Sequence, residues 1–217
     1  MYVWDFASLW EYRSLLLAGI GTTLFSALTV IAAGLSLGVT VGLGRLSPRR
    51  CLRGALGVYV AIFQCTPVLV QLLWFYYALP MLLGIALTPM SAAMLCLTLY
   101  GGAFYAEIVR GGMLAVDAGQ TLAALALGMT RAQALWRVVL PQALRHMTAP
   151  LAGQSALQLK NTALLSVIAI PDLLHQGQLI AHETYRPLEI YTLVAALYFL
   201  LLYPIPILVK RLEKARA

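Results

Sequence analysis

The sequence predicts an all-α membrane protein with five transmembrane helices and one cytoplasmic helical hairpin. Its 217 residues are 61% hydrophobic and only 11% charged, whereas soluble domains carry about 25% charged residues. Three long stretches contain no charged residue at all: Ser14–Gly44, Gly54–Ala106 and Ile190–Val209. One long polar stretch, Gly119–Pro150, interrupts the apolar pattern and is the source of the predicted hairpin.

The apolar stretches divide into five segments of membrane-spanning length. A spanning helix needs roughly 20 apolar residues, so the second stretch is long enough for two helices. A natural break lies between Leu83-Gly84 and Thr88-Pro89. The fourth segment is apolar apart from Lys160 and a few amides. The predicted spans are Ser14–Leu43, Ala55–Leu82, Met90–Val109, Met147–Ile170 and Leu188–Val209.

The basic residues orient these spans. Of the 15 Lys and Arg residues, 12 fall on one side of the predicted membrane, Arg13 and Arg186 fall on the other, and Lys160 lies inside a span. The positive-inside rule makes the richer side cytoplasmic, so we expect the N-terminus outside and the C-terminus inside. This asymmetry explains the net charge of +7, which therefore does not indicate a nucleic-acid partner. The 12 residues are Arg45, Arg49, Arg50, Arg53, Arg110, Arg131, Arg137, Arg145, Lys210, Arg211, Lys214 and Arg216.

The chain is predicted to form one transmembrane domain over residues 1–217, with no internal repeat. Many single-chain transporters build their path from two internal repeats. Five helices can hardly enclose a path alone, so we expect an oligomer, most economically a dimer.

Few residues outside the spans indicate metal or disulfide chemistry. We expect Pro171–Pro187 to be an external loop, in which His175, His182 and Glu183 are solvated residues that face a partner rather than metal ligands. The three cysteines imply neither a disulfide nor a metal framework: Cys51, Cys65 and Cys96.

The polar stretch has the local signals of a helical hairpin. Gln120–Leu127 has a helix-forming composition and ends at Gly128, which suits the left-handed residue that closes a helix. Thr130 is then expected to cap a second helix, with Gln133 at the capping-box spacing. This helix is predicted to run to about residue 140, where a proline favours a bend into the fourth span.

The hairpin carries more apolar residues than a free cytosolic loop. One interpretation is a pair of interfacial helices on the lipid headgroups, with Arg131 and Arg137 facing phosphates. The other is a docking surface for a partner protein.

Several motifs of the chain resemble one family. The spacing of Ala123-Ala124, Gly128 and Leu140-Pro141 is similar to the cytoplasmic EAA loop of permeases of binding-protein-dependent ABC importers. The wider context resembles the polar amino acid permeases of the histidine/glutamine/arginine type. The further matching stretches, in chain order from about Arg45, are Thr66–Leu69, Gly102–Gly112, Gly119-Gln120, Leu140–Arg145 and Lys160–Leu164.

The chain departs from the family pattern at three places. Leu122 replaces the Glu of the EAA motif, which removes one polar contact to an ATPase. Gln64-Cys65 replaces an Arg-Gly pair, and Asn161 replaces an Asp. Loss of the Arg and Asp charges would change the substrate preference of the permease. Alternatively, it would mean that this chain pairs with a different permease chain and contacts the substrate less than that chain does.

The resemblance implies a multi-pass permease of the bacterial cytoplasmic (inner) membrane that moves a polar or charged amino acid inwards. The implied partners are two copies of an ABC ATPase, a second permease chain, identical or related, and a periplasmic or lipid-anchored amino-acid-binding protein. ATP and Mg²⁺ would bind the ATPase, since this chain lacks the P-loop motif and is expected to hold no catalytic site, cofactor or metal. A coupling loop at about residues 114–146 would dock the ATPase through Gln120, Leu122, Ala123, Ala124, Gly128, Thr130 and Arg131.

Polar residues within the predicted spans suggest a substrate path, because charge inside a membrane is expensive and usually functional. An ion pair or hydrogen-bond network between spans explains them equally well. Pro67 would free a backbone carbonyl for a ligand or a neighbouring helix, although a simple kink is the commoner explanation. The candidates are Gln64, Thr66, Pro67, Gln71, Glu107, Gln154, Gln158, Lys160 and Asn161.

The residues alone leave two other functional classes possible. A secondary transporter or channel would also span the membrane, but it would need neither the hairpin nor ATP. An intramembrane hydrolase would need Ser155 or Ser166 next to a histidine, and the histidines lie at membrane edges or in loops.

Overall fold

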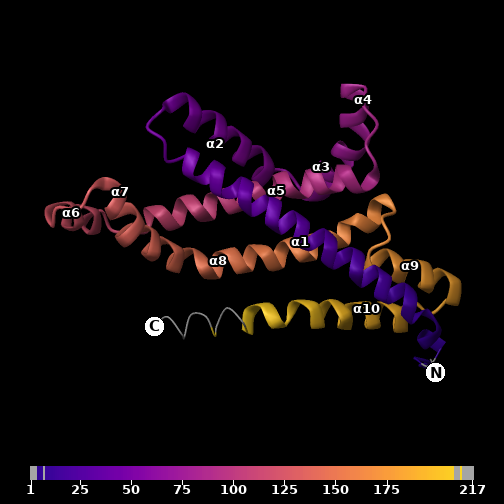
Figure 1. The fold of residues 1–217 in the computed structure, drawn as a ribbon. Coiled ribbons are helices and arrows are strands. Elements are labelled where there is room, and N and C mark those ends of the chain that lie inside the picture. The colour runs from indigo at the N-terminus through magenta and orange to yellow at the C-terminus, as the bar shows by residue number, and fades with distance from the viewer. Residues whose placement is uncertain (1–3, 7, 208–210, 212–217) are drawn as a thin grey trace.

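A computed structural model describes residues 4–6, 8–207 and 211, and all regular structure within them is helical (Figure 1). This confirms the predicted all-α class. The predicted basic residues Lys210, Lys214 and Arg216 lie outside the described residues. The elements are η1 (Ser8–Tyr12), α1 (Arg13–Gly44), α2 (Arg50–Cys65), α3 (Val68–Leu73), η2 (Trp74–Ala78), α4 (Leu79–Leu83), α5 (Pro89–Leu114), α6 (Ala118–Ala126), α7 (Arg131–Ala134), η3 (Leu135–Val139), α8 (Leu140–Asn161), η4 (Thr162–Ile168), α9 (Leu173–Thr184) and α10 (Pro187–Leu202).

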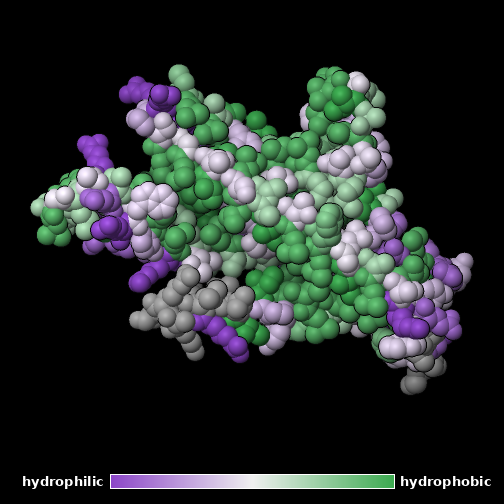
Figure 2. All heavy atoms as spheres, in the orientation of Figure 1, coloured by the Kyte–Doolittle hydropathy of each residue, from purple (hydrophilic) through white to green (hydrophobic). Residues whose placement is uncertain are grey.

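Three helices are long and apolar enough to cross a membrane unbroken, and up to five spans result if two bent helix pairs each count as one. The unbroken helices are Leu9–Gly44, Pro89–Leu114 and Pro187–Ile207, close to the first, third and fifth predicted spans. Figure 2 shows an apolar middle with hydrophilic residues gathered at two opposite ends. One end holds the α6–α7 hairpin and the start of α2, and the other holds α9 and the N-terminal residues.

The second predicted span is not one continuous helix. Its two halves, Arg50–Cys65 and Val68–Leu83, meet at an angle of 105°. The break falls at Thr66 and Pro67, which both have extended backbone angles. Pro67 disfavours the helical conformation for Thr66 and cannot donate a hydrogen bond to Phe63. The sequence predicted a simple kink at Pro67, but the change of direction between the two helices is far larger than a kink.

The predicted external loop Pro171–Pro187 is largely helical, which corrects that expectation. Asp172 caps α9 by accepting a hydrogen bond from the backbone N–H of His175 at 2.8 Å. Leu173 and Ile180 are buried against residues of α1 and α10, and Tyr185 closes the helix with a φ of 55°. The apolar residues of this segment recur at helical spacing, and burying them favours a packed helix over a loop.

The second helix of the hairpin does not end near residue 140, so this prediction was also wrong. Residues 135–139 form a π-helical turn, and helix α8 continues directly from it through Pro141. The backbone N–H of Leu140 reaches the carbonyl of Leu135, five residues back. This wider turn changes the hydrogen-bond register just before the proline, so the chain stays helical.

Helices α1 and α5 form the central packing contact. Glycines on one side of α1 let the two backbones approach closely, as small residues do between membrane helices. A side chain added at Gly42 would lie 2.7 Å from the carbonyl oxygen of Ala106. Beside this contact, residues of α1, α3, η2, α5 and η4, together with Ile170 just after η4, form a large buried cluster. Its members are Val30, Leu72, Phe75, Ala93, Cys96, Leu97, Leu165, Ile168 and Ile170.

Candidate functional site

The hairpin of α6 and α7 has a defined local geometry at its turn. Gly128 lies in the left-handed region, with a φ of 83°. The Thr130 hydroxyl accepts a hydrogen bond from the backbone N–H of Gln133 at 3.3 Å, and the Gln133 side chain accepts one from the N–H of Thr130 at 2.9 Å. The predicted glycine turn and the predicted capping box are therefore confirmed as local structure.

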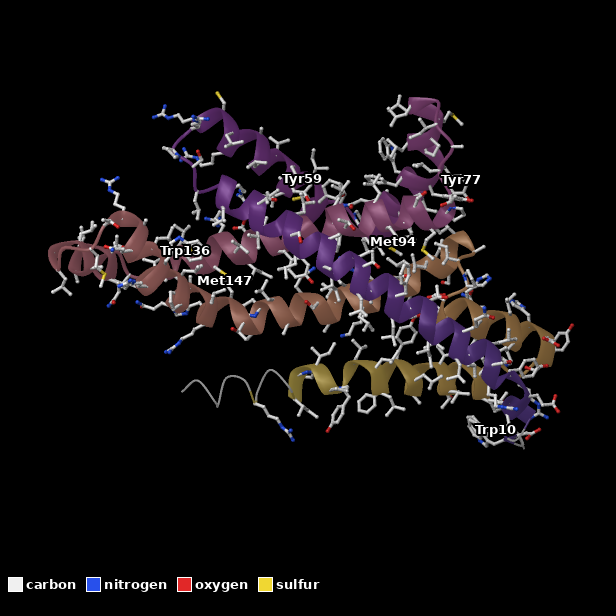
Figure 3. All side chains as sticks on the ribbon, viewed as in Figure 1. Trp10, Tyr59, Tyr77, Met94, Trp136 and Met147 are labelled. Carbon is white, nitrogen blue, oxygen red and sulfur yellow. The ribbon has the colours of Figure 1, made fainter. Side chains whose placement is uncertain are left out.

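The hairpin exposes an apolar surface at its polar end of the molecule. Leu122, Leu127 and Trp136 have 66%, 80% and 68% of their area exposed, and Figure 3 shows Trp136 at this end, beside the hairpin. Of the other predicted docking residues, Gln120, Ala123, Gly128, Thr130 and Arg131 are exposed. Ala124 instead is buried, so it supports the hairpin and does not reach the outer surface.

The structure places Gln64 and Glu107 together at one cavity. This cavity of ≈ 560 Å³ lies between α2, α5 and α8, and His146 and Pro150 of α8 also line it. The Glu107 carboxylate forms ion pairs with both Arg45 and Arg110, and the Arg110 Nε–Oε1 distance is 3.0 Å. The Arg45 pair connects the end of α1 to α5, whereas the Arg110 pair lies within α5. An ion pair between spans was one of the two explanations predicted for Glu107.

The break at Pro67 is held together by Gln71. Its amide nitrogen donates to the carbonyl oxygens of Phe63 at 3.1 Å and Thr66 at 3.0 Å, and also contacts the Thr66 hydroxyl. In an unbroken helix the carbonyl of Phe63 would receive the N–H of residue 67, which proline lacks. The freed carbonyl therefore binds the neighbouring helix α3. A second cavity of ≈ 390 Å³, lined by Thr66, Gln71 and Trp74 among others, lies beside the break.

Two predicted path residues of α8 face the protein core. Gln158 is fully buried and donates to the carbonyl of Leu97 in α5 at 2.8 Å. Gln154 is also buried, and its amide nitrogen has no hydrogen-bond partner within the described residues. Gln158 in turn accepts a hydrogen bond from Asn161 at 3.2 Å. It therefore positions Asn161 and is too deeply buried to contact a substrate itself.

The opposite face of α8 carries Lys160. The exposed residues His146, Pro150, Gly153, Leu157 and Lys160 recur at intervals of four and three, which places them in one stripe along the helix. The stripe begins at the ≈ 560 Å³ cavity and ends at Lys160. No carboxylate within the described residues forms an ion pair with Lys160.

Sequence reasoning missed the pairing of Arg45 with Glu107 and the bridging role of Gln71. Arg45 was interpreted only as a cytoplasmic charge, although it directly follows the first apolar stretch. Gln71 follows Pro67 by four residues, and this spacing was the available signal. The hydrolase arrangement is not present among the described residues, because the Ser155 hydroxyl contacts Tyr105 and Leu151 and that of Ser166 donates to Ala163.

Residues 15–217 match the family described as binding-protein-dependent transport system inner membrane component. The chain belongs to this family. It is 34% identical over 211 residues to the glutamine transport system permease protein GlnP of Escherichia coli (strain K12), covering 97% of this chain and 96% of GlnP. It is 37% identical over 198 residues to the octopine transport system permease protein OccM of Rhizobium meliloti, covering 88% and 81% of the two chains.

Solved structures show the same fold. A chain of a crystal structure of an amino acid ABC transporter with histidines superposes with a TM-score of 0.92 at 33% identity, covering 99% of this chain and all of that one. An inward-facing structure of the MetNI methionine ABC transporter superposes with a TM-score of 0.79 at 23% identity, covering 95% and 98%. The chain therefore has the fold of an ABC importer permease and is a membrane protein.

Proposed function

We propose that this chain is the permease subunit of an ABC importer that moves a polar or charged amino acid into the cytoplasm. Membership of the family supports the transport role, and relatives named for glutamine and octopine support the substrate class. The observation that carries the proposal is the hairpin with the Gly128 turn, which exposes apolar residues at a polar end of the molecule.

The hairpin would be the coupling element, with the coupling loop at about residues 114–146 of a single domain, 1–217. Its end of the molecule would be cytoplasmic, since α2 begins there with Arg50 and Arg53, and the N-terminus and α9 would be outside. Movement of the ATPase would push the hairpin, and α8 would carry the motion into the membrane because it continues without interruption from α7 and η3.

The partners would be two copies of an ABC ATPase, a second permease chain and an amino-acid-binding protein outside the membrane. ATP and Mg²⁺ would bind the ATPase, and this chain would supply no cofactor or catalytic site. Exposed leucines, a tryptophan and arginines at the hairpin suit a partner surface with apolar and acidic character.

The substrate path would follow the exposed stripe of α8. Lys160 lies about 20 Å along the helix from Met147, at 1.5 Å per residue, so it would lie well inside a hydrocarbon core of about 30 Å. An ionised lysine at this depth requires a water-filled path or a partner charge. Lys160 and Asn161 would contact the substrate, while Gln64 and Glu107 would line the cytoplasmic exit.

The experiment is purification of this chain from cells that also express the ATPase and binding protein of its importer, followed by measurement of ATP hydrolysis in lipid nanodiscs. We expect the ATPase to co-purify, and its activity to rise on addition of amino-acid-loaded binding protein. A secondary transporter or channel would purify without an ATPase and transport in the absence of ATP, and either result would contradict the proposal.

A further inference from the structure

Most carboxylates of this chain either form ion pairs or hydrogen bonds within the chain or lie far from the proposed substrate path. The chain has eight Asp and Glu residues, and all but Glu213 lie in the described residues. Five lie at the two polar ends of the molecule: Asp5, Glu11, Asp117, Glu183 and Glu189. Glu107 in α5 and Asp172 at the start of α9 are the other two in the described residues.

Both remaining carboxylates already have partners. Glu107 forms ion pairs with Arg45 and Arg110, so the three side chains together carry one net positive charge. Asp172 is fully buried, accepts the N–H of His175 at 2.8 Å and lies 3.4 Å from the Tyr198 hydroxyl. Lys160 therefore has no free carboxylate available to it in the described part of this chain.

The side chain that follows Lys160 in the sequence, the amide of Asn161, carries no charge that could balance the lysine. Asn161 is half-buried and held by Gln158, which is itself fixed to the carbonyl of Leu97. The proposed path thus presents the cation of Lys160 in the stripe and, next to it in the sequence, the fixed amide of Asn161. At its other end the ≈ 560 Å³ cavity contains Glu107, which two arginines already neutralise.

We propose that this path selects amino acids by charge and carries neutral or acidic ones, excluding those with a cationic side chain. This inference rests on the proposed function and names its substrate class. The substrate carboxylate would be the counter-ion of Lys160, and Asn161 would contact an uncharged or acidic side chain. Every amino acid brings an α-ammonium together with its carboxylate, so a lysine or arginine substrate would bring one cation more towards Lys160 than a neutral substrate does. No free carboxylate among the described residues would receive that extra charge, which electrostatics disfavours.

The test measures direct binding of radiolabelled glutamine, glutamate and arginine to the complete permease–ATPase complex in nanodiscs. The binding protein is left out, because its own selectivity would mask that of the permease. We expect glutamine or glutamate to bind, and arginine to bind at least about tenfold more weakly. Asn161→Asp should raise arginine affinity about tenfold and lower that for glutamate. Lys160→Gln should weaken glutamine and glutamate alike.

Gln178→Glu, an amide-to-acid change in α9 at the other end of the molecule, is the matched control and should leave all three affinities unchanged. The inference is overturned if unmodified complex binds arginine as tightly as glutamine, or binds none of the three. It is also overturned if Lys160→Gln dissociates the permease pair, because Lys160 would then be an interface residue. Stimulation of ATP hydrolysis by loaded binding protein, measured on the same complex, tests the proposed function separately.

Discussion

At the scale of single residues, Gln71 shows how one side chain stabilises a broken membrane helix. Its amide spans the gap left by Pro67 and satisfies the carbonyls of Phe63 and Thr66. In a bilayer an unsatisfied backbone group costs free energy, because no water replaces the missing partner. The 105° angle between α2 and the helices that follow therefore depends on this residue.

Replacing Gln71 by leucine keeps the size but removes the hydrogen bonds to the two carbonyls and the contact with the Thr66 hydroxyl. We expect Gln71→Leu to reduce stability by roughly 1–3 kcal/mol, the usual cost of leaving a buried carbonyl unpaired. Thermal unfolding of the purified protein in detergent measures this as a lower midpoint. Gln64→Leu is the matched control, since Gln64 is exposed and makes one long contact of 3.5 Å. Equal midpoints for the two variants would contradict the bridging role.

Residue-scale prediction from sequence succeeded where the signal was local. Gly128 and the pair Thr130 and Gln133 were identified because turn and capping chemistry depends on a few neighbouring residues. Gln154 and Gln158 were placed on a path, but they face the core. Their orientation depends on which side of α8 packs against α5, and the weak amphipathicity of membrane helices does not reveal that side.

At the scale of elements, the two π-helical turns share one arrangement. Each is followed directly by Leu-Pro: Trp74–Ala78 precedes Leu79 and Pro80, and Leu135–Val139 precedes Leu140 and Pro141. In both cases the leucine N–H bonds five residues back. Proline in a helix usually indicates an end or a kink, so sequence reasoning predicted a bend at Pro141. The wider turn instead keeps η3 and α8 continuous.

The hairpin is the element whose surface chemistry can be tested most simply. Leu122 and Leu127 are exposed on it, and burial of a leucine side chain contributes about 1.5–3 kcal/mol. We expect Leu122→Ser and Leu127→Ser each to weaken ATPase binding about tenfold or more, measured by titrating purified ATPase onto the permease in nanodiscs. Leu52→Ser is the control, because Leu52 is also exposed and lies at the same end, in α2. Unchanged affinity in both hairpin variants would place the docking surface elsewhere.

At the scale of the whole molecule, composition and charge predicted the class but not the path of the chain. The spans at α1, α5 and α10 follow from apolar length alone. The sharp break after α2 does not, because its angle depends on how the Gln71 amide bonds across Pro67. The helical α9 does not either, because it depends on contacts with segments distant in sequence. Asp172 and Leu173, for example, pack beside Thr23 of α1, whose hydroxyl accepts the Leu173 N–H at 3.1 Å.

The proposed orientation predicts opposite accessibility for the two polar ends. Cys51 is exposed at the start of α2, and Tyr185 has 88% of its area exposed beyond α9. In a variant that retains only Cys51, a membrane-impermeant maleimide should label the protein only after the cells are permeabilised. With Tyr185→Cys in a cysteine-free chain, labelling should occur in intact spheroplasts. The reverse pattern would show that the charge asymmetry was misinterpreted.

In the proposed importer, ATP hydrolysis by another subunit would drive the movement of this chain through contacts at the Gly128 turn. The most direct measurement is ATP-dependent amino-acid uptake into proteoliposomes that contain the permease, its ATPase and its binding protein, with Gly128→Val compared with Gly128→Asn. Valine strains a φ of 83°, at a cost of about 1–2 kcal/mol or more, whereas asparagine tolerates it. We predict that the valine variant loses uptake while the asparagine variant keeps most of it. Uptake that persists without the ATPase, or that is unchanged in Gly128→Val, would show that the Gly128 turn does not couple ATP hydrolysis to transport.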